Sequence, residues 1–426
     1  MRIWLVTIGE PVPVDDGSRD RLHRTGYLAH FLADHGHDVV WWTSTFDHFR
    51  KKHLFESDTD VEVNGHFVIR LLKGCGYRSN LSYSRVKDHR QVAARYAELA
   101  RQVADGPDII VSALPTIELC DESVRFGRER GVPVVLDMRD MWPDIFVSSV
   151  PGPARPPARL LLGPMFRQAA RACANATAIC GITEAFVGWG LRRGNRTAGP
   201  LDRAFPMGYL TKPPSAESIR DAEEFWDGLG IKADSGEFVA CFIGAVGRQF
   251  DLETVIRAAR DLRRRGKQAR FVLCGSGDML ERYRRLAGDE PSVMFPGWVD
   301  SAQIHVLMRR ASVGIDPMMD RYDFLATINN KAIEYMSAGL PVVSSPARGV
   351  LFDMLRDHRC GVSYNDGDSG GLADVLAGLI DDSGRLTEMA ANSAQLFEST
   401  FTAERVYAEM MAYLEEVAAA KGASDG

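Results

Sequence analysis

This sequence lacks several features that would assign a chain to a special class. It has no stretch near the roughly 20 apolar residues that a membrane-spanning helix requires, and the apolar run after Met1 is too short for the core of a secretion signal. Its net charge of −6 argues against a general nucleic-acid-binding protein. None of its seven cysteines forms a Cys-x-x-Cys pair, which excludes the common zinc and thiol-redox motifs.

The cysteines that are present lie mostly within apolar runs, such as Cys241 and Cys274. We therefore expect buried, reduced thiols and a cytoplasmic location. Two Asp-x-Asp triplets begin at Asp58 and Asp366, but neither follows a strand at the expected edge of a sheet, so neither is interpreted as a divalent-metal site. No cofactor and no metal are expected.

Length and composition indicate two ordinary globular domains. A chain of 426 residues exceeds what one hydrophobic core usually serves, and 45% apolar with 25% charged residues is typical of globular proteins. Strand patterns alternate with helical patterns in both halves, which predicts an α/β fold of two Rossmann-like domains whose parallel sheets face a central cleft. We predict domains over 1–212 and 213–402. An amphipathic helix over 403–420 then either returns to the first domain or binds a partner, and a short tail follows to 426.

The first half opens with a strand over 3–8, a loop, a helix over 19–35 and a strand over 38–43. The loop lies where open α/β sheets bind ligands, and it lacks the Gly-x-Gly-x-x-Gly fingerprint of dinucleotide sites. Gly17 and Arg19 are its acceptor-side candidates. A later strand over 132–138 runs into a segment with three more candidate groups and a tryptophan. These residues form either an active-site rim or a buried ion pair anchored by the indole: Asp137, Arg139, Asp140 and Trp142.

The stretch 327–345 carries the strongest signal. It reads Thr-Ile-Asn-Asn-Lys-Ala-Ile-Glu-Tyr-Met-Ser-Ala-Gly-Leu-Pro-Val-Val-Ser-Ser, which predicts a short helix ending near Gly339 and then a buried strand. A helix that starts at Asn329 and Asn330 offers unpaired amides and partial positive charge to a phosphate, and Lys331 adds a full charge. Glu334, one turn further on, is placed to accept hydrogen bonds from a ribose diol.

This stretch resembles the donor-site motif of family 4 glycosyltransferases, Asn-Lys-x-x-Glu-Tyr-Met-x-Ala-Gly-x-Pro-Val-Val, which begins here at Asn330. Other segments of the second half match that family in order: a glycine-rich turn after a strand over 238–244, a Gly-x-Gly turn and a Phe-x-Gly-x-Val segment over 295–299. The resemblance implies a GT-B fold, a nucleoside-diphosphate-sugar donor and retention at the anomeric carbon. The donor contacts that it implies are Gly244, Gly247, Arg248, Gln249, Gly275, Gly277, Trp298, Val299, Asn329, Asn330, Lys331 and Glu334. Packing at a strand end is the other interpretation of Trp298.

Two departures from the family pattern leave roles open. Many relatives carry a carboxylate eight positions before Glu334, where it contacts the donor sugar, and Ala326 stands there in this chain. Asp320, Asp323, Thr327 or backbone amides are the alternatives. Many relatives also carry a histidine near the acceptor, where Arg139 and Asp140 stand in this chain. A carboxylate at this point either accepts the acceptor's proton or orients the acceptor.

Residues 151–171 combine an apolar run over 160–166 with Arg155, Arg159, Arg167 and Arg171. The pattern predicts a surface element that meets anionic lipid headgroups at the inner face of the membrane, or a mobile loop with acceptor contacts. A connecting helix that enters the core is the alternative.

Taken with the resemblance, the sequence predicts a retaining glycosyltransferase of bacterial surface-polysaccharide or glycan biosynthesis. Its partners are a nucleotide-sugar donor and a glycan, lipid-linked or protein-linked acceptor, and no nucleic acid is expected. Arg139, Asp140, Arg248 and Lys331 are the catalytic candidates. Arg248, Lys331 and the helix amides would stabilise the leaving diphosphate without a metal. The alternatives are another GT-B enzyme, such as a nucleotide-sugar epimerase or an inverting transferase, and a catalytically silent nucleotide-binding protein.

Overall fold

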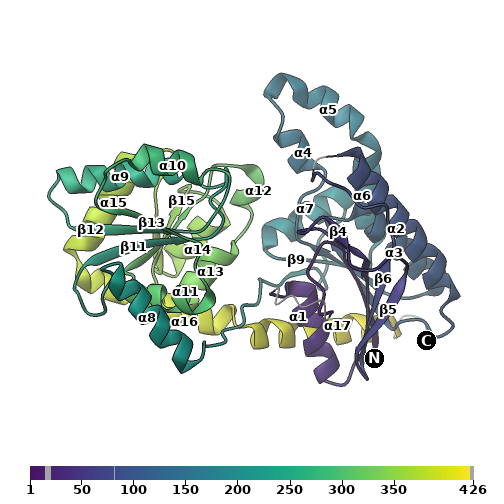
Figure 1. The fold of residues 1–426 in the computed structure, drawn as a ribbon. Coiled ribbons are helices and arrows are strands. Elements are labelled where there is room, and N and C mark those ends of the chain that lie inside the picture. The colour runs from purple at the N-terminus through teal and green to yellow at the C-terminus, as the bar shows by residue number, and fades with distance from the viewer. Residues whose placement is uncertain (15–20, 81, 423–426) are drawn as a thin grey trace. The chain divides into compact units, whose positions relative to one another are not determined.

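The computed structural model describes residues 1–14, 21–80 and 82–422, and the chain divides into two compact units (Figure 1). Unit 1 contains residues 1–208 and 403–426, and unit 2 contains residues 209–402. Each unit has a parallel-rich sheet with helices, so the predicted α/β class with two Rossmann-like domains is confirmed. The units divide close to the predicted border after residue 212.

Unit 1 is built on an eight-stranded sheet with the order β10-β9-β8-β7-β1-β2-β6-β5. The strands are β1 Arg2–Val6, β2 Asp38–Ser44, β5 Thr59–Asn64, β6 Phe67–Leu72, β7 Ile109–Leu114, β8 Val134–Met138, β9 Ala178–Gly181 and β10 Arg203–Ala204. Strands such as β7 are buried along their whole length, as expected of a parallel sheet covered on both faces. A short hairpin, β3 Phe46–Asp47 and β4 Lys52–His53, follows β2.

The helices of unit 1 are α1 Arg24–Asp34, α2 Tyr83–Gln102, α3 Ile117–Arg130, α4 Asp144–Ser148, η1 Gly152–Ala154, α5 Arg155–Leu161, α6 Gly163–Asn175, α7 Glu184–Gly194 and α17 Ala403–Gly422. Helix α1 starts at Arg24, later than the predicted 19. Residues 15–20, which include the acceptor-side candidates Gly17 and Arg19, lie outside the described residues.

Strand β5 departs from the predicted all-parallel sheet, because it pairs antiparallel with β6. The two strands are joined by the turn at Gly65 and His66, where the side chain of Asn64 accepts a hydrogen bond from the amide of His66 at 2.9 Å. Asn followed by Gly is a turn signal that the sequence interpretation did not use. The alternating burial of β5 fits an edge strand with one covered face.

Helix α17 belongs to the core of unit 1. Its buried side chains recur at helical spacing and join the cluster that contains Ile3, Leu5 and Leu28 of the sheet and α1; they are Val406, Met410, Tyr413, Leu414 and Val417. Among the described residues, no helix combines the length and the apolar character that crossing a bilayer requires.

Unit 2 holds a six-stranded parallel sheet with the order β13-β12-β11-β14-β15-β16. Its strands are β11 Phe238–Ile243, β12 Ala269–Cys274, β13 Val293–Gly297, β14 Val313–Pro317, β15 Val342–Ser345 and β16 Gly361–Ser363. Its helices are α8 Ala216–Gly228, α9 Leu252–Arg264, α10 Leu280–Ala287, α11 Ser301–Arg310, α12 Tyr322–Leu325, α13 Asn330–Ser337, α14 Val350–Asp357, α15 Ser369–Asp381 and α16 Ser383–Thr400.

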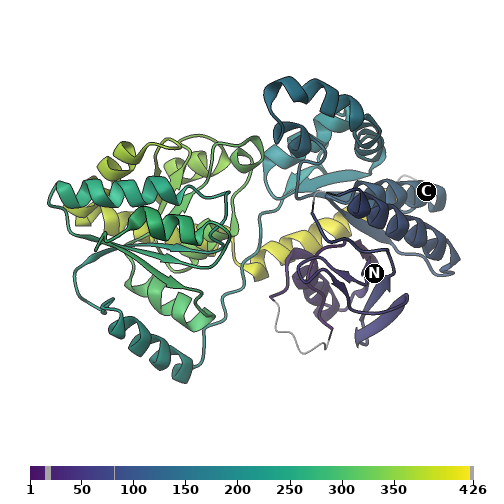
Figure 2. The ribbon, with the colours of Figure 1, turned by 45° about the horizontal axis from the view of Figure 1, so that its top comes forward.

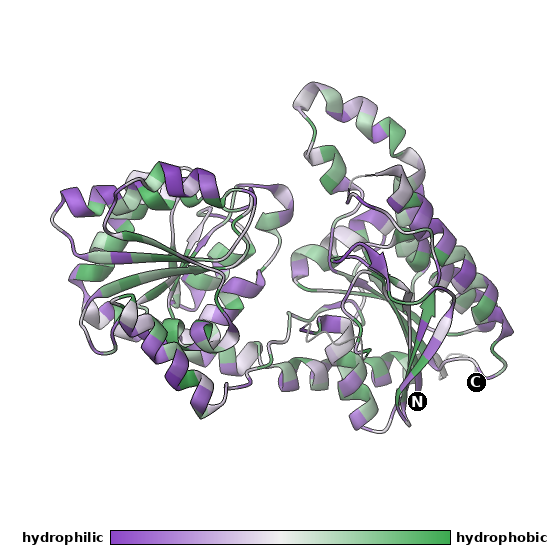
Figure 3. Cartoon of the chain, in the orientation of Figure 1, coloured by the Kyte–Doolittle hydropathy of each residue, from purple (hydrophilic) through white to green (hydrophobic). Residues whose placement is uncertain are grey.

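The helices of unit 2 cover both faces of its sheet (Figure 2). Figure 3 shows the consequence for side-chain character: the strands are mainly hydrophobic, while the helices alternate between polar and apolar positions. The chain adds strands outward from β11 to β13 and then returns to β14 on the other side of β11. Ligands of such sheets bind at the carboxyl ends of the strands where the order reverses. In unit 2 this place lies between β11 and β14.

Candidate functional site

The candidate donor site lies at the carboxyl ends of β11 and β14, where α13 also begins. The side chain of Asn329 caps this helix by accepting a hydrogen bond from the amide of Ala332 at 3.1 Å. Gly339 ends the helix with a φ of +71°, a left-handed conformation that glycine adopts without strain. The amide of Leu340 donates to the carbonyl of Tyr335 at 2.9 Å, which completes the cap. The predicted start and end of the helix are confirmed.

Tyr335 fixes the orientation of α13 on the sheet. Its hydroxyl accepts a hydrogen bond from the amide of Ile243 at 3.0 Å and donates to the carbonyl of Ile315 at 3.3 Å. Its ring fills the space that a side chain at Gly314 would need. Because these contacts tie the helix to both β11 and β14, the neighbouring Lys331 and Glu334 are held in one rotational setting.

Lys331 crosses the backbone of the first glycine-rich turn. A Cβ at Gly244 would overlap the end of its side chain, so this glycine is required for the lysine to lie here. The ammonium Nζ sits 3.9 Å from the ring centre of Phe250 and 5.5 Å from that of Phe242. Burial lowers the pKa of Lys331, and the nearby carboxylates of Asp316 and Glu334 act in the opposite direction. A poorly hydrated cation of this kind interacts strongly with an incoming anion.

Asp316, at the end of β14, is a site residue that the sequence interpretation missed. It is completely buried, and it accepts a hydrogen bond from the side-chain amide of Asn329. Its other oxygen, Oδ1, has no hydrogen-bond partner in the described part of the chain. Burial raises the pKa of Asp316 to about 6, against the effects of Asn329 and Lys331. An aspartate that directly ends an apolar strand was the available signal.

The raised pKa of Asp316 predicts a pH dependence of nucleotide binding. The carboxyl is neutral below about pH 6 and ionised above it, and an ionised Asp316 repels a diphosphate held at Lys331. We expect affinity for a nucleoside diphosphate to fall about three- to tenfold between pH 5 and 7.5 for this reason. Because the nucleotide itself titrates in this range, the measurement is the difference between wild type and Asp316→Asn by calorimetry. Identical pH profiles for the two proteins would contradict the assignment.

The glycines of the Gly-x-Gly turn hold two loops together. A Cβ at Gly275 would overlap the carbonyl oxygen of Gly244, and one at Gly277 would overlap that of Val246. The amide of Val246 donates to the carbonyl of Ser276 at 2.9 Å across the same contact. These glycines are therefore needed for loop packing, and their contact with a donor stays a prediction.

The charged and aromatic groups of the predicted donor loops are open to solvent. The side chain of Arg248 is 84% exposed and lies 3.5 Å from the carboxylate of Asp278. Trp298 is 73% exposed, so the interpretation that it packs at a strand end is wrong, while its neighbour Val299 is buried. Gln249 fills the space beside Gly247. An exposed indole ring beside an edge strand has a face available for stacking.

Glu334 has a partner from a distant part of unit 2. The hydroxyl of Tyr209 donates a hydrogen bond to its Oε1 at 2.5 Å. Tyr209 is itself held by its amide, which donates to the carbonyl of Phe401 at 2.8 Å, and by an edge contact with the ring of Phe397. Tyr209 is the second residue that the sequence interpretation missed, since the two side chains are 125 positions apart.

The carboxylates proposed to replace the one absent at Ala326 are both paired with arginines. Asp320 accepts a hydrogen bond from the guanidinium of Arg348 at 2.9 Å, and Asp323 is 2.9 Å from Arg321. A role for either in contacting the donor sugar stays a prediction.

In unit 1, the acceptor-side candidate Asp137 and the catalytic candidate Arg139 belong to one buried ionic network. Asp137 is completely buried and accepts hydrogen bonds from Nε of Arg24 at 3.0 Å and Nε of Arg139 at 2.7 Å. Arg139 also donates to Glu10 and, at 2.8 Å, to the hydroxyl of Thr25. Burial alone would raise the pKa of Asp137, but the guanidinium groups of Arg139 and Arg24 outweigh it and hold that pKa well below the usual range.

This network corrects part of the acceptor prediction. The carboxylate of Asp137 cannot reach an acceptor, because it is enclosed between two arginines. Trp142 is only 6% exposed and stacks on the ring of His89. Asp140 keeps a partly exposed position, where it accepts hydrogen bonds from the amide of Met141 at 2.7 Å and the indole of Trp142 at 3.1 Å. The interpretation as a buried ion pair with a tryptophan anchor holds for Asp137, Arg139 and Trp142, and a catalytic role for Arg139 stays a prediction.

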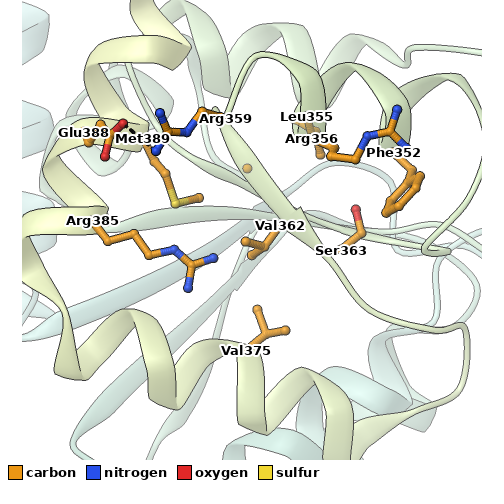
Figure 4. Close-up of a pocket in the computed structure, with 11 residues that line it drawn as sticks. Phe352, Leu355, Arg356, Arg359, Val362, Ser363, Val375, Arg385, Glu388 and Met389 are labelled. Carbon is orange, nitrogen blue, oxygen red and sulfur yellow. Dashed lines mark ion pairs between the residues drawn. The ribbon is translucent and has the colours of Figure 1, made fainter.

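A separate pocket of about 550 Å³ opens beside the edge strand β16, between α14, α15 and α16 (Figure 4). It contains none of the predicted site residues. Two of its arginines, Arg356 and Arg359, pair with acidic side chains at 3.0 and 3.2 Å. Most of its charge is thereby compensated, and we assign no ligand to it. No group of three or more His, Cys, Asp or Glu side chains suited to a metal occurs within the described ranges.

Comparisons with known proteins agree with the motifs. A family model described as "Glycosyl transferase 4-like domain" matches residues 23–200, and one described as "Glycosyl transferases group 1" matches residues 237–382. The α-D-kanosaminyltransferase of Streptomyces kanamyceticus is 24% identical over 202 residues, which cover 46% of this chain and 50% of that protein. The match therefore spans about half the length of this curated relative.

Solved structures share the fold over nearly the whole chain. Sucrose-phosphate synthase of Thermosynechococcus elongatus superimposes with a TM-score of 0.69 at 18% identity, covering 98% of this chain and 99% of that one. Anabaena HepE, solved in complex with UDP, gives a TM-score of 0.66 at 15% identity, covering 97% and 99%. The two family models fall in order, one within each unit, and the donor motif lies inside the second. The chain therefore belongs to the family 4 glycosyltransferases.

Proposed function

We propose that the protein transfers a sugar from a nucleoside-diphosphate sugar, bound by unit 2, to a hydroxyl group of an acceptor, with retention of the anomeric configuration. The observation that carries the proposal is Lys331: a partly desolvated ammonium held over Gly244 at the start of α13, at the point where the strand order of the sheet reverses. A half-buried cation at a helix N-terminus is an arrangement that suits a bound phosphate group.

The leaving diphosphate would be stabilised by this cation together with the amides at Asn329 and Asn330. The solvent-exposed Arg248 can close over the same group from the loop after β11. Charge that develops on the leaving oxygen then meets preorganised donors, and we propose that the reaction needs no metal. Retention would follow from attack on the same face that the diphosphate leaves, with a diphosphate oxygen taking up the acceptor's proton. In this account Asp140 of unit 1 orients the acceptor hydroxyl or accepts its proton.

The ribose assignment of Glu334 is tested by its removal. We expect Glu334→Ala to weaken nucleoside-diphosphate binding by about 2 kcal/mol or more, since two charge-assisted hydrogen bonds are lost. Tyr209→Phe should cost about 0.5–1.5 kcal/mol, because it leaves the carboxylate in place without the hydroxyl that positions it. Calorimetric titration with the nucleotide measures both. An unchanged affinity in a folded Glu334→Ala protein would refute the assignment.

We also propose that α5 attaches unit 1 to an anionic membrane surface. Leu160 and Leu161 are 83% and 81% exposed, and α5 stands out from the body of unit 1 (Figures 1 and 2). Residues 150–171 contain no acidic side chain. Arg159 packs over Phe166 at 4.9 Å, whereas Arg171 pairs with Asp121 and does not join the patch. The next helix, α6, does enter the core, so the core interpretation holds for 163–175 alone.

Vesicle co-sedimentation tests this attachment. Leu160→Glu combined with Leu161→Glu should reduce binding to vesicles containing phosphatidylglycerol by about tenfold or more, since two apolar side chains leave the lipid and two negative charges enter. Leu210→Glu, at an exposed leucine of unit 2, is the control and should bind like wild type. Equal sedimentation of all three proteins would contradict the attachment.

A further inference from the structure

A second group of cationic side chains lies in unit 1, at loops that the donor site does not use. His48 and Lys51 belong to the β3–β4 hairpin after β2, Tyr77 follows β6, and Arg85 lies in the first turn of α2. The carboxyl ends of β2 and β6 are neighbours in the parallel sheet, so these loops converge at the edge where such sheets bind ligands.

The ring of Tyr77 organises the group. Lys51 Nζ lies 4.9 Å from its centre, and the Arg85 guanidinium lies 5.5 Å from it and 4.5 Å from the centre of the Trp142 ring. Both cations donate to the same residue: Lys51 to the side-chain oxygen of Asn80 at 2.5 Å and Arg85 to its carbonyl at 3.0 Å. The fold thus holds two positive charges, those of Lys51 and Arg85, against the ring of Tyr77 and the neutral Asn80.

Within the described part of the chain, no carboxylate forms an ion pair with Lys51 or Arg85. Asp47, Asp88 and Asp140 act on the two cations only at longer range. Burial lowers the pKa of both side chains, so both are partly desolvated. Two like charges held on one ring repel each other, the more so because Arg85 is largely buried, and a bound anion would offset that repulsion.

His48 supplies a third, neutral donor. The hydroxyl of Tyr77 lies 2.6 Å from Nδ1 of His48 and donates to it when the neutral ring keeps its proton on Nε2. Burial lowers the pKa of His48 to about 4, so the ring is neutral near pH 7 and carries its own proton on Nε2. A guanidinium, an ammonium and an imidazole N–H together match the three oxygens of a phosphate better than the two of a carboxylate.

We propose that His48, Lys51 and Arg85 bind a phosphate or diphosphate group of the acceptor, so that the acceptor is a sugar carried on a phosphate ester and not a neutral glycan. The proposal rests on the proposed transferase function, because it assigns this edge of unit 1 to the acceptor. It selects the phosphate-linked class among the acceptors that the sequence leaves open.

The test measures anion binding with the donor site already filled. The protein is saturated with the nucleoside diphosphate that it binds and titrated calorimetrically with farnesyl diphosphate, inorganic pyrophosphate or farnesol. Lys51→Gln and Arg85→Gln should each weaken farnesyl diphosphate binding about tenfold, as expected for loss of one charge-assisted contact. Lys87→Gln, at an exposed lysine of the same helix α2, is the matched control and should bind like wild type.

The probes separate the two sources of phosphate. Equal affinities for pyrophosphate and farnesyl diphosphate would support the site and indicate that its ligand is a free sugar phosphate. A higher affinity for farnesyl diphosphate would indicate a sugar on a lipid phosphate carrier. Farnesol bound as tightly as either, or farnesyl diphosphate bound equally by all variants, overturns the proposal. If the wild-type protein binds no nucleoside diphosphate, the transferase function itself is refuted. Should Arg85→Gln fail to fold, Lys51→Gln and the charge-preserving Arg85→Lys decide the outcome.

Discussion

Replacing Lys331 by methionine should reduce the rate of sugar transfer by about 10²–10³-fold, the range found when one preorganised donor to a developing oxyanion is removed. Methionine retains most of the apolar stem that lies across Gly244, so the loss reports the charge and not the fold. Affinity for the free nucleoside diphosphate should fall as well, because the product carries the same diphosphate. The measurement is steady-state release of nucleoside diphosphate from the sugar nucleotide that wild type consumes.

The control for this variant is Lys232→Gln, which removes an exposed lysine from unit 2 and should leave the rate within about twofold of wild type. A Lys331→Met protein that turns over within threefold of wild type would contradict the assignment. Rates that fall equally in both variants would mean that net charge, and not this ammonium, controls the reaction.

The second large effect concerns stability. Asp137→Asn should destabilise unit 1 by about 3–5 kcal/mol, because it leaves the buried guanidinium groups of Arg24 and Arg139 without the carboxylate between them. Urea unfolding followed by tryptophan fluorescence measures this, since five of the seven tryptophans belong to unit 1: Trp4, Trp41, Trp42, Trp142 and Trp189. Nucleotide binding by unit 2 should be retained.

The pH dependence of the same group has a definite sign. The pKa of Asp137 is held below its unfolded value. Its contribution to the stability of unit 1 is therefore present above about pH 4 and is lost as the pH falls through the folded pKa.

The control for Asp137→Asn is a surface pair. Glu129→Gln breaks an exposed contact with Arg101 and should lower the stability by less than about 1 kcal/mol. Equal costs for the buried and the exposed variant would contradict the network's role.

Much of the donor site could be predicted because its chemistry is local in the sequence. The cap at Asn329, the charge at Lys331, the carboxylate at Glu334 and the stop at Gly339 lie within a few turns of one helix. Sequence spacing alone therefore puts them together. The alternation of strands and helices predicted the sheets for the same reason, apart from β5, where the turn that follows Asn64 was overlooked.

The remaining site residues depend on contacts between distant segments. Tyr209 meets Glu334 across 125 positions, and Arg24 meets Asp137 across 113. Nothing in the local pattern of either segment names its partner. The acceptor-side prediction failed at Asp137 in this way, because the sequence showed a charged strand end but not the second arginine that encloses it. Asp316 was missed although the sequence placed it at the end of a strand. Its raised pKa results from burial, which the local sequence does not reveal.

The most direct test of the account is a thermal-shift screen with UDP, GDP, ADP, dTDP and CMP, each without and with EDTA. The account predicts that one nucleoside diphosphate, at about 100 times its Kd, raises the Tm of unit 2 by about 2–6 °C. EDTA should leave this shift unchanged, and the Lys331→Met substitution should abolish it. No shift with any nucleotide would favour a protein without donor binding, and a shift abolished by EDTA would contradict the metal-free diphosphate site at Lys331.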